Sequence, residues 1–254
     1  MKEYIRLFNA PDECYEGGRI AKKLFYEEGN LNSSDRELFT TDINKIVLEY
    51  MFSEDRINIK AYKDEEIECE EIAVIRVILE NDRKFKRICE IIQRAIPYSI
   101  ILICEFENKV IFNVANKKIN KVDIDKNTID EMLYTEWINL DSQVETDNKF
   151  FDELDIRKWS YIDLYKFYNS FVDNVKLYNA AKYSNNIDGL KELDVEVIKK
   201  ITDKIEKLGL EIVRLRNNLK KESQFNKKIE INIKIKKIQE EQNKLILSLK
   251  GEYR

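Results

Sequence analysis

Residues 72–106 read IAVIRVILENDRKFKRICEIIQRAIPYSIILICEF, and this stretch decides the fold. Its first segment, IAVIRVIL, is nearly all apolar and rich in β-branched side chains, which is typical of a strand buried in a sheet. Residues 83–96 then repeat apolar side chains with the period of a helix, and Pro97 ends that pattern. SIILICEF (99–106) is a second apolar segment of strand length. The order strand, helix, strand predicts a sheet with a helix packed on it.

The residues before this stretch predict one more helix and one more strand. Ser34 and Glu37 form an S-x-x-E capping box, and apolar residues at helical spacing follow them. We therefore expect a helix over residues 33–53. A short strand is expected at residues 57–61.

The residues after the stretch extend the sheet. Asn108 and Lys109 predict a turn into VIFNVA (110–115), which gives a hairpin. MLYTEWI (132–138) has the composition of a further strand. Residues 1–150 are therefore expected to form an α+β domain with a mixed or antiparallel sheet and packed helices.

Two helical regions follow residue 150. Residues 151–192 carry many aromatic side chains at helical spacing, so we expect them to pack as a helix on the sheet domain. Residues 193–254 contain two seams of apolar residues spaced three and four apart. The seams consist of Ile198, Ile201, Ile205, Leu208, Ile212, Leu215 and Leu219, and of Ile231, Ile235, Ile238, Gln242, Leu245 and Leu249. The phase breaks near residues 223–225, which predicts an antiparallel coiled-coil hairpin of two helices.

Part of the second seam also fits a strand. KIEINIKIK (228–236) alternates strictly between polar and apolar residues, which is the strand pattern. We favour the helix, because the seam continues to Leu249 and no partner strand is evident nearby.

Charge is distributed unevenly along the chain. With 44 basic and 48 acidic residues the net charge is −4, which argues against a protein that binds nucleic acid over its whole surface. Residues 214–237 nevertheless hold nine cations and two anions, a local charge of 9 − 2 = +7. The cations are Arg214, Arg216, Lys220, Lys221, Lys227, Lys228, Lys234, Lys236 and Lys237. At the end of a hairpin they would bind DNA phosphates or an acidic partner, or form an ordinary solvated helix face.

Two isoleucines of the second helix fall outside the seam. Ile229 and Ile233 lie about 160–200° from the seam around the helix axis, at 100° per residue. A pair of apolar side chains on an outer face either packs on the sheet domain or anchors another subunit, a second copy of this chain included.

The composition excludes several classes of protein. The chain has no histidine, which excludes Ser–His and Cys–His nucleophiles and His-ligated zinc. No two of the four cysteines form a C-x-x-C pair, and free thiols in apolar segments fit a reducing cytosol. No signal peptide and no apolar run of about 18 residues is present, so we expect a cytoplasmic protein without a membrane segment. No motif implies a cofactor or a metal site.

One short motif matches part of a metal-dependent nuclease site. Glu107-Asn108-Lys109 spells Glu-x-Lys, with Glu105 two residues earlier. In such enzymes the acids hold Mg²⁺ and the lysine polarises the phosphate or the attacking water. The turn predicted at Asn108 would place Lys109 across the hairpin from Glu107, so we expect no catalytic activity. A divergent Mg²⁺-dependent nuclease with Glu105, Glu107 and Lys109 is the alternative.

Six segments in order resemble a known family. They are GGRIAKKLFYEEGNLNSSDRELFTTDI (17–43), INIKAYKDEEIECEEIAVIRV (57–77), RAIPYSIILI (94–103), TEWI (135–138), YIDLYKFYNSFVDNV (161–175) and KKESQFNKKIEINIKIKKI (220–238). Together they resemble an uncharacterised prokaryotic family, the domain of unknown function 4391. The family pattern has histidine where this chain has Gln93 and Asn116, and we expect structural roles at both positions.

The resemblance implies a setting for the protein. Members are typically encoded beside helicase and DNA-methyltransferase genes, in clusters that resemble type III restriction or phage-defence systems. The resemblance implies this context and no activity. Together with the basic hairpin, it leads us to expect a non-catalytic accessory subunit that docks a helicase–methyltransferase partner or DNA through that hairpin. The alternative is a divergent metal-dependent nuclease effector of the same system.

Overall fold

The computed structural model describes residues 2–28, 31–119, 127–184 and 187–251. The chain forms two compact units, Met1–Val175 and Lys176–Arg254, which we name the sheet unit and the hairpin unit. The division falls within helix α7 (Leu164–Ser184).

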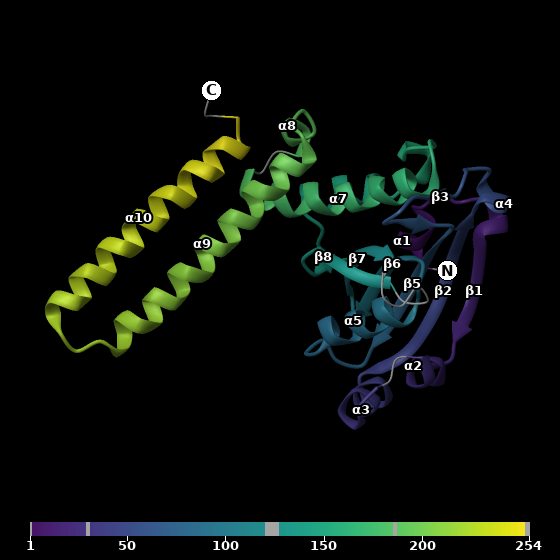
Figure 1. Cartoon of the computed structure of the whole chain (residues 1–254), viewed down its shortest axis with the longest axis horizontal. Helices are drawn as coiled ribbons and strands as arrows, with labels where there is room; N and C mark the ends of the chain where they lie inside the picture. Colours follow the sequence, from purple (N-terminus) through teal and green to yellow (C-terminus); the bar gives the residue numbers. More distant parts are fainter. Residues whose placement is uncertain (1, 29–30, 120–126, 185–186, 252–254) are drawn as a thin grey trace. The chain divides into compact units, whose positions relative to one another are not determined.

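A seven-stranded mixed sheet, counted over the described residues, forms the sheet unit (Figure 1). Its order is β1-β2-β5-β6-β7-β8, and β9 pairs with β7. Only the β5–β6 pair among the recorded pairings is parallel. The strands are β1 (Tyr15–Ile20), β2 (Ile43–Ser53), β5 (Glu71–Leu79), β6 (Ser99–Phe106), β7 (Lys109–Ile119), β8 (Asn127–Tyr134) and β9 (Ile138–Asn139). The α+β fold with a mixed sheet is therefore confirmed.

The decisive strand–helix–strand unit is present as predicted. Helix α5 (Phe85–Ala95) connects β5 to β6, as a crossover between parallel strands requires. Both strands are almost entirely buried, because helices cover both faces of the sheet where they lie. The hairpin at Asn108 also forms, with β6 and β7 antiparallel.

Helices pack on both faces of the sheet. On one face α5 joins α2 (Lys22–Glu28) and α3 (Ser33–Thr41) in a core that includes Phe25, Phe39 and Ile92. On the other face aromatic rings pack together, among them Trp159 and Phe167, whose centroids are 4.8 Å apart. Tyr168 of α7 donates its hydroxyl to the carbonyls of Ile100 and Ala115, at 3.2 and 3.0 Å. These bonds tie the aromatic helix to two central strands.

Short elements complete the sheet unit. They are α1 (Glu3–Arg6), α4 (Glu54–Ile57), α6 (Glu145–Asp152), the 3-10 helices η1 (Asp12–Cys14) and η2 (Ile156–Lys158), and the two-stranded ribbon of β3 (Tyr62–Lys63) and β4 (Glu68–Cys69).

The helix predicted over residues 33–53 is wrong in its second half. Helix α3 ends at Thr41, and residues 43–53 form strand β2 between β1 and β5. The apolar residues of β2 face both sides of the sheet, so their spacing also fits a helical period. The cap differs as well, because the side chain of Asn32 accepts from the amide of Asp35 at 2.8 Å.

Two predicted strands also need correction. Residues 57–61 are not a strand, because α4 ends at Ile57 and Asn58 adopts a left-handed conformation with φ of 53°. Residues 132–138 are split between β8 and β9. The split is at Thr135, whose amide and hydroxyl both bond Phe112 of β7, at 2.9 and 3.0 Å.

All the regular secondary structure among the described residues of the hairpin unit is helical. Helices α9 (Val195–Lys221) and α10 (Phe225–Leu249) run side by side in opposite directions (Figure 1), joined by residues 222–224. Helix α8 (Ile187–Leu190) and the last part of α7 pack at the end far from the turn. The strand alternative for residues 228–236 is therefore wrong, since they belong to α10.

Both predicted seams form the core of the hairpin. Ile212, Ile235 and Ile238 are buried together, with Leu208, Leu215, Leu219 and Ile231 packed around them. Nearer the open end, Ile198, Ile205 and Leu249 are buried with residues of α7 and α8. The polar seam residue Gln242 donates to the carbonyl of Ile205 at 3.0 Å. Asp194 caps α9 by accepting from the amides of Glu196 and Val197.

Candidate functional site

The two units carry opposite net charges. The sheet unit has 25 basic and 36 acidic residues, a net charge of −11, and the hairpin unit has 19 and 12, a net charge of +7. Within the hairpin unit, residues 214–237 alone account for +7. The positive charge of this unit is therefore concentrated in the half of the hairpin that contains the turn.

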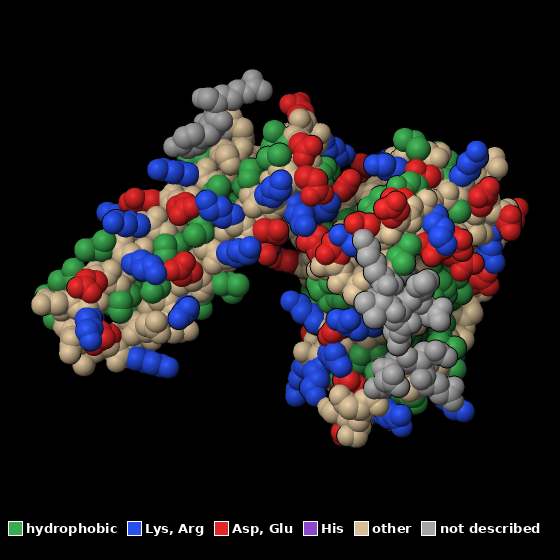
Figure 2. Space-filling view, viewed as in Figure 1, with side chains coloured by type: hydrophobic (Ala, Val, Ile, Leu, Met, Phe, Trp, Pro, Cys, Tyr) green, Lys and Arg blue, Asp and Glu red, His purple; other side chains and the backbone are tan. Residues whose placement is uncertain are grey.

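Only one of the nine predicted contact residues makes an ion pair among the described residues. Lys234 pairs with Glu211 of α9 at 2.8 Å, across the two helices. The other eight make no ion pair with a described residue: Arg214, Arg216, Lys220, Lys221, Lys227, Lys228, Lys236 and Lys237. All of these are exposed except Lys228, which is half-buried. Figure 2 shows Lys and Arg side chains along the hairpin.

The cations surround the hairpin rather than lining one face. Arg214 and Arg216 point about 160° apart around α9, and Lys236 and Lys237 differ by about 100° around α10. Lys220, Lys221, Lys227 and Lys228 flank the turn from both helices. This arrangement suits contact with an anionic surface at the end of the hairpin.

Ile229 and Ile233 lie outside the seam, as their spacing predicts. Their side chains are 42% and 52% exposed, and neither belongs to the buried cluster of α9 and α10. Whether they bind a partner stays a prediction.

In the sheet unit, a cluster of charged side chains lies on three adjacent strands. Arg76 of β5 donates from Nε to Oε1 of Glu49 on β2 at 2.6 Å, and from Nη1 to Oε2 of Glu105 on β6 at 2.9 Å. Tyr4 of α1 donates its hydroxyl to the same Glu105 oxygen at 2.7 Å, and Lys2 pairs with Oε1 at 2.8 Å. Both glutamates are buried, whereas Lys2 is half exposed, so water reaches the cluster only on the side of Lys2.

The environment of this cluster keeps Glu105 ionised. Burial alone would raise the pKa of Glu105, but the hydrogen bonds from Lys2, Tyr4 and Arg76 outweigh it and lower the pKa. Burial and the contact with Glu105 raise the pKa of Tyr4. Both groups therefore keep one protonation state at neutral pH, which suits a structural role better than proton transfer.

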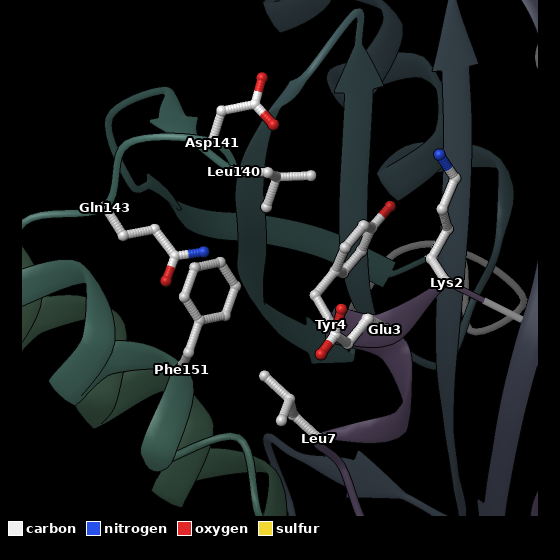
Figure 3. Close-up of a pocket in the computed structure, with 8 residues that line it drawn as sticks. All are labelled: Lys2, Glu3, Tyr4, Leu7, Leu140, Asp141, Gln143 and Phe151. Atoms are coloured by element: carbon white, nitrogen blue, oxygen red, sulfur yellow. The ribbon is translucent and has the colours of Figure 1, made fainter.

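A pocket of about 530 Å³ opens beside this cluster (Figure 3). Lys2, Glu3, Tyr4 and Leu7 line it from the N-terminal segment, and Leu140, Asp141, Gln143 and Phe151 line it from the opposite side. Lys2 and Tyr4 already bond Glu105, and Asp141 accepts from the side-chain amide of Asn108 at 2.7 Å. Three polar groups of the wall are thus bonded to other residues of the protein.

The three residues of the nuclease alternative are not brought together. Glu105 belongs to the charged cluster beneath α1. Glu107 sits in the exposed hairpin turn with φ of 53°. Lys109 pairs with Asp82 at 2.7 Å, and its ammonium lies 5.1 Å from the centroid of the Trp137 ring, which packs on Phe85 of α5.

No metal centre is evident in the part of the chain that the structure describes. No group of three or more His, Cys, Asp or Glu residues there could hold a metal ion. The four cysteines are free and buried. None of the described helices combines the length and the apolar character that crossing a membrane requires.

The charged cluster is the feature that sequence analysis missed. Its signal was present, because Arg76 interrupts the apolar segment IAVIRVIL and Glu49 interrupts IVLEYMF. A charged residue inside a buried strand needs partners, and adjacent strands are the nearest source. Gln93 is also buried, where it donates to Asn113 at 3.0 Å, and its Oε1 has no hydrogen-bond partner.

Comparison with known proteins identifies one family. A family model described as a domain of unknown function (DUF4391) matches residues 8–241, which is nearly the whole chain. No curated protein and no solved structure matches the chain.

Proposed function

Because the chain belongs to the DUF4391 family, we propose that it is a non-catalytic accessory subunit of a prokaryotic restriction or phage-defence system that acts on DNA. We infer the kind of system from the gene neighbourhood that the family resemblance implies, which contains helicase and DNA-methyltransferase genes. In this proposal the end of the hairpin binds DNA phosphates, and the chain docks a helicase or methyltransferase subunit in the cytoplasm.

The observation that carries the proposal is the set of eight cations without an ion pair near the turn. Residues 214–237 contain only two acidic residues, so the nine cations of this segment are not neutralised locally. Cations that neutralise DNA phosphates release the counterions condensed on the DNA, and this release drives binding. Heptad seams support a coiled-coil arm stiff enough to present the cluster.

The geometry supports an accessory role better than a catalytic one. The alternative nuclease residues point to different surroundings, and two of them are held by other protein side chains. The proposed function therefore requires no cofactor, and Mg²⁺ enters only in the alternative.

Charge reversal tests the DNA contact. We expect Lys220→Glu, Lys221→Glu, Lys227→Glu and Lys228→Glu together to weaken binding of duplex DNA by about tenfold or more at low salt. The wild-type affinity should fall steeply with salt, for the same reason. The matched control reverses four exposed cations of the sheet unit, Arg6, Lys60, Arg83 and Lys84, which changes the net charge equally.

The readout is fluorescence anisotropy, with circular dichroism to check folding. The control should retain most of the affinity of the wild type. Equal losses in both variants would mean that net charge alone matters, and no wild-type binding at low salt would refute the DNA contact. Co-purification with the neighbouring helicase and methyltransferase tests the docking part separately.

A further inference from the structure

Three exposed apolar residues form a row on the outer side of α10. Phe225, Ile229 and Ile233 are four residues apart, so they lie on one side of the helix and extend over about 12 Å. We name them the apolar strip. Their exposed fractions are 74%, 42% and 52%. Single exposed apolar residues are ordinary, but a contiguous row of large ones marks an interaction surface.

The strip does not contribute to the hairpin core. The seam of α10, with Ile231, Ile235 and Ile238, faces α9, and the strip points to nearly the opposite side. Packing within the hairpin therefore gives no reason for isoleucine at 229 and 233.

Cations border the strip. Lys236 and Lys237 follow Ile233 by three and four residues, which makes them its neighbours on the next turn, and Glu230 is its neighbour on the preceding turn. Both are exposed and neither has an ion pair among the described residues. The apolar strip and the two lysines next to it are together complementary to an apolar row that has acidic residues beside it.

We infer that the apolar strip docks an amphipathic helix of another protein, one that carries an apolar row flanked by Asp and Glu. A helix of this kind buries the isoleucines and pairs the lysines at the same time. DNA would satisfy Lys236 and Lys237 but would leave the isoleucines in contact with phosphates. A second copy of α10 in parallel register would place lysines against lysines, which is repulsive.

This inference goes beyond the proposed DNA contact. The two proposals share Lys236 and Lys237, but their test variants change different residues. Charge reversal changes four lysines that flank the turn, and the docking test changes Ile229 and Ile233, so either proposal can fail alone.

A synthetic peptide tests the inference directly. The probe has about 20 residues, long enough to form helix, with leucine at every third or fourth position and glutamate on both flanks. A control peptide replaces the glutamates by lysines. Binding to the full chain is measured by fluorescence anisotropy at physiological salt.

The protein variants form a matched pair. Ile229→Asp with Ile233→Asp changes the strip, and Leu210→Asp with Val213→Asp changes two apolar residues of α9 that are 72% and 55% exposed. We expect micromolar binding of the acidic peptide by the wild type, a loss of at least tenfold in the strip variant, and less than a twofold change in the α9 variant. The lysine peptide should not bind.

Several results would overturn the inference. No saturable binding of the acidic peptide, or equal binding to both variants, would reject the strip as its site. A melting temperature that falls in the strip variant but not in the α9 variant would show that the strip packs within the chain. Loss of a dimer in the strip variant, measured by analytical ultracentrifugation, would identify a second copy as the occupant.

Discussion

Arg76 joins two buried carboxylates that lie on either side of it in the sheet. Its guanidinium is the right group for this position, because it keeps its charge and offers donors in two directions. Removing it would leave Glu49 and Glu105 buried with fewer partners. The stability of the sheet unit therefore depends strongly on Arg76. A purely apolar core would not depend so strongly on a single residue.

We expect Arg76→Met to lower the free energy of unfolding by about 3–5 kcal/mol, because it leaves an uncompensated buried charge. Urea denaturation followed by tryptophan fluorescence measures the change. Arg76→Lys is the control. Lysine keeps the positive charge but has a single compact ammonium in place of the guanidinium, so this variant should lose less stability than Arg76→Met. A loss below about 1 kcal/mol for Arg76→Met would show that water or relaxation satisfies the two acids.

Glu105 should make stability depend on acidic pH. Its pKa in the folded protein is below the ordinary value of 4.5, so near that pH the unfolded chain binds more protons than the folded one. The stabilisation from Glu105 is therefore complete above the unfolded pKa and is lost as pH falls through the folded pKa. Melting temperatures at a series of pH values should fall less steeply below about pH 5 in Glu105→Gln than in the wild type.

That comparison is made between slopes rather than absolute stabilities. Glu105→Gln removes a charge beside Arg76 and Lys2 and should lower stability at neutral pH as well. Parallel curves for the two proteins would mean that Glu105 does not carry the acid dependence.

At the scale of elements, the two isoleucines 233 and 235 provide an internal comparison. They belong to one helix, but Ile235 is 7% exposed and faces α9, whereas Ile233 is 52% exposed. The same substitution at both positions separates core packing from helix propensity.

We expect Ile235→Ala to destabilise the hairpin by about 2–4 kcal/mol, through lost burial and the cavity left behind. Ile233→Ala should stay within about 0.5 kcal/mol of the wild type. Native-state hydrogen exchange of α9 and α10 amides measures both, and it reports on the hairpin even if the sheet unit stays folded. Similar effects at the two positions would contradict the assigned seam.

The elements also show what sequence patterns can predict. The hairpin was predictable in detail, because its seams repeat every three to four residues and its turn falls where the phase breaks. Strand β2 was not, because a strand with apolar residues on both faces has no unique period. Strand β5 was clear because its residues are nearly all apolar, and helix α5 and strand β6 were clear because Pro97 separates them.

The site followed the same pattern. The nine cations were predictable as a cluster, since they are close in sequence and their helices were recognised. The partners of Arg76 are residues 49 and 105, which only the strand order brings beside it, and the N-terminal segment then bonds Glu105. Contacts between distant segments depend on topology, which single-sequence patterns do not contain.

At the scale of the whole molecule, the absence of nuclease activity is a prediction. The purified chain should leave duplex and single-stranded DNA intact with Mg²⁺ or Mn²⁺, because Glu105, Glu107 and Lys109 occupy separate surroundings. Gel electrophoresis of labelled DNA measures cleavage. Metal-dependent cleavage that disappears in both Glu107→Ala and Lys109→Ala would establish the nuclease alternative instead.

The division of charge between the units has a consequence for how the protein meets a polyanion. At 0.1 M salt the Debye length is about 10 Å, and beyond it the charge of each unit is screened. At lower salt a distant polyanion interacts with the net charge of the whole chain, which is −4. Long-range attraction therefore does not steer this protein to DNA as it steers a basic protein, and capture depends on near encounters with the hairpin. Stopped-flow measurements should show an association rate constant that gains little as salt is lowered, while the dissociation rate constant falls. A steep rise in the association rate constant at low salt would mean that the positive charge of the hairpin unit attracts DNA even at long range, despite the negative charge of the sheet unit.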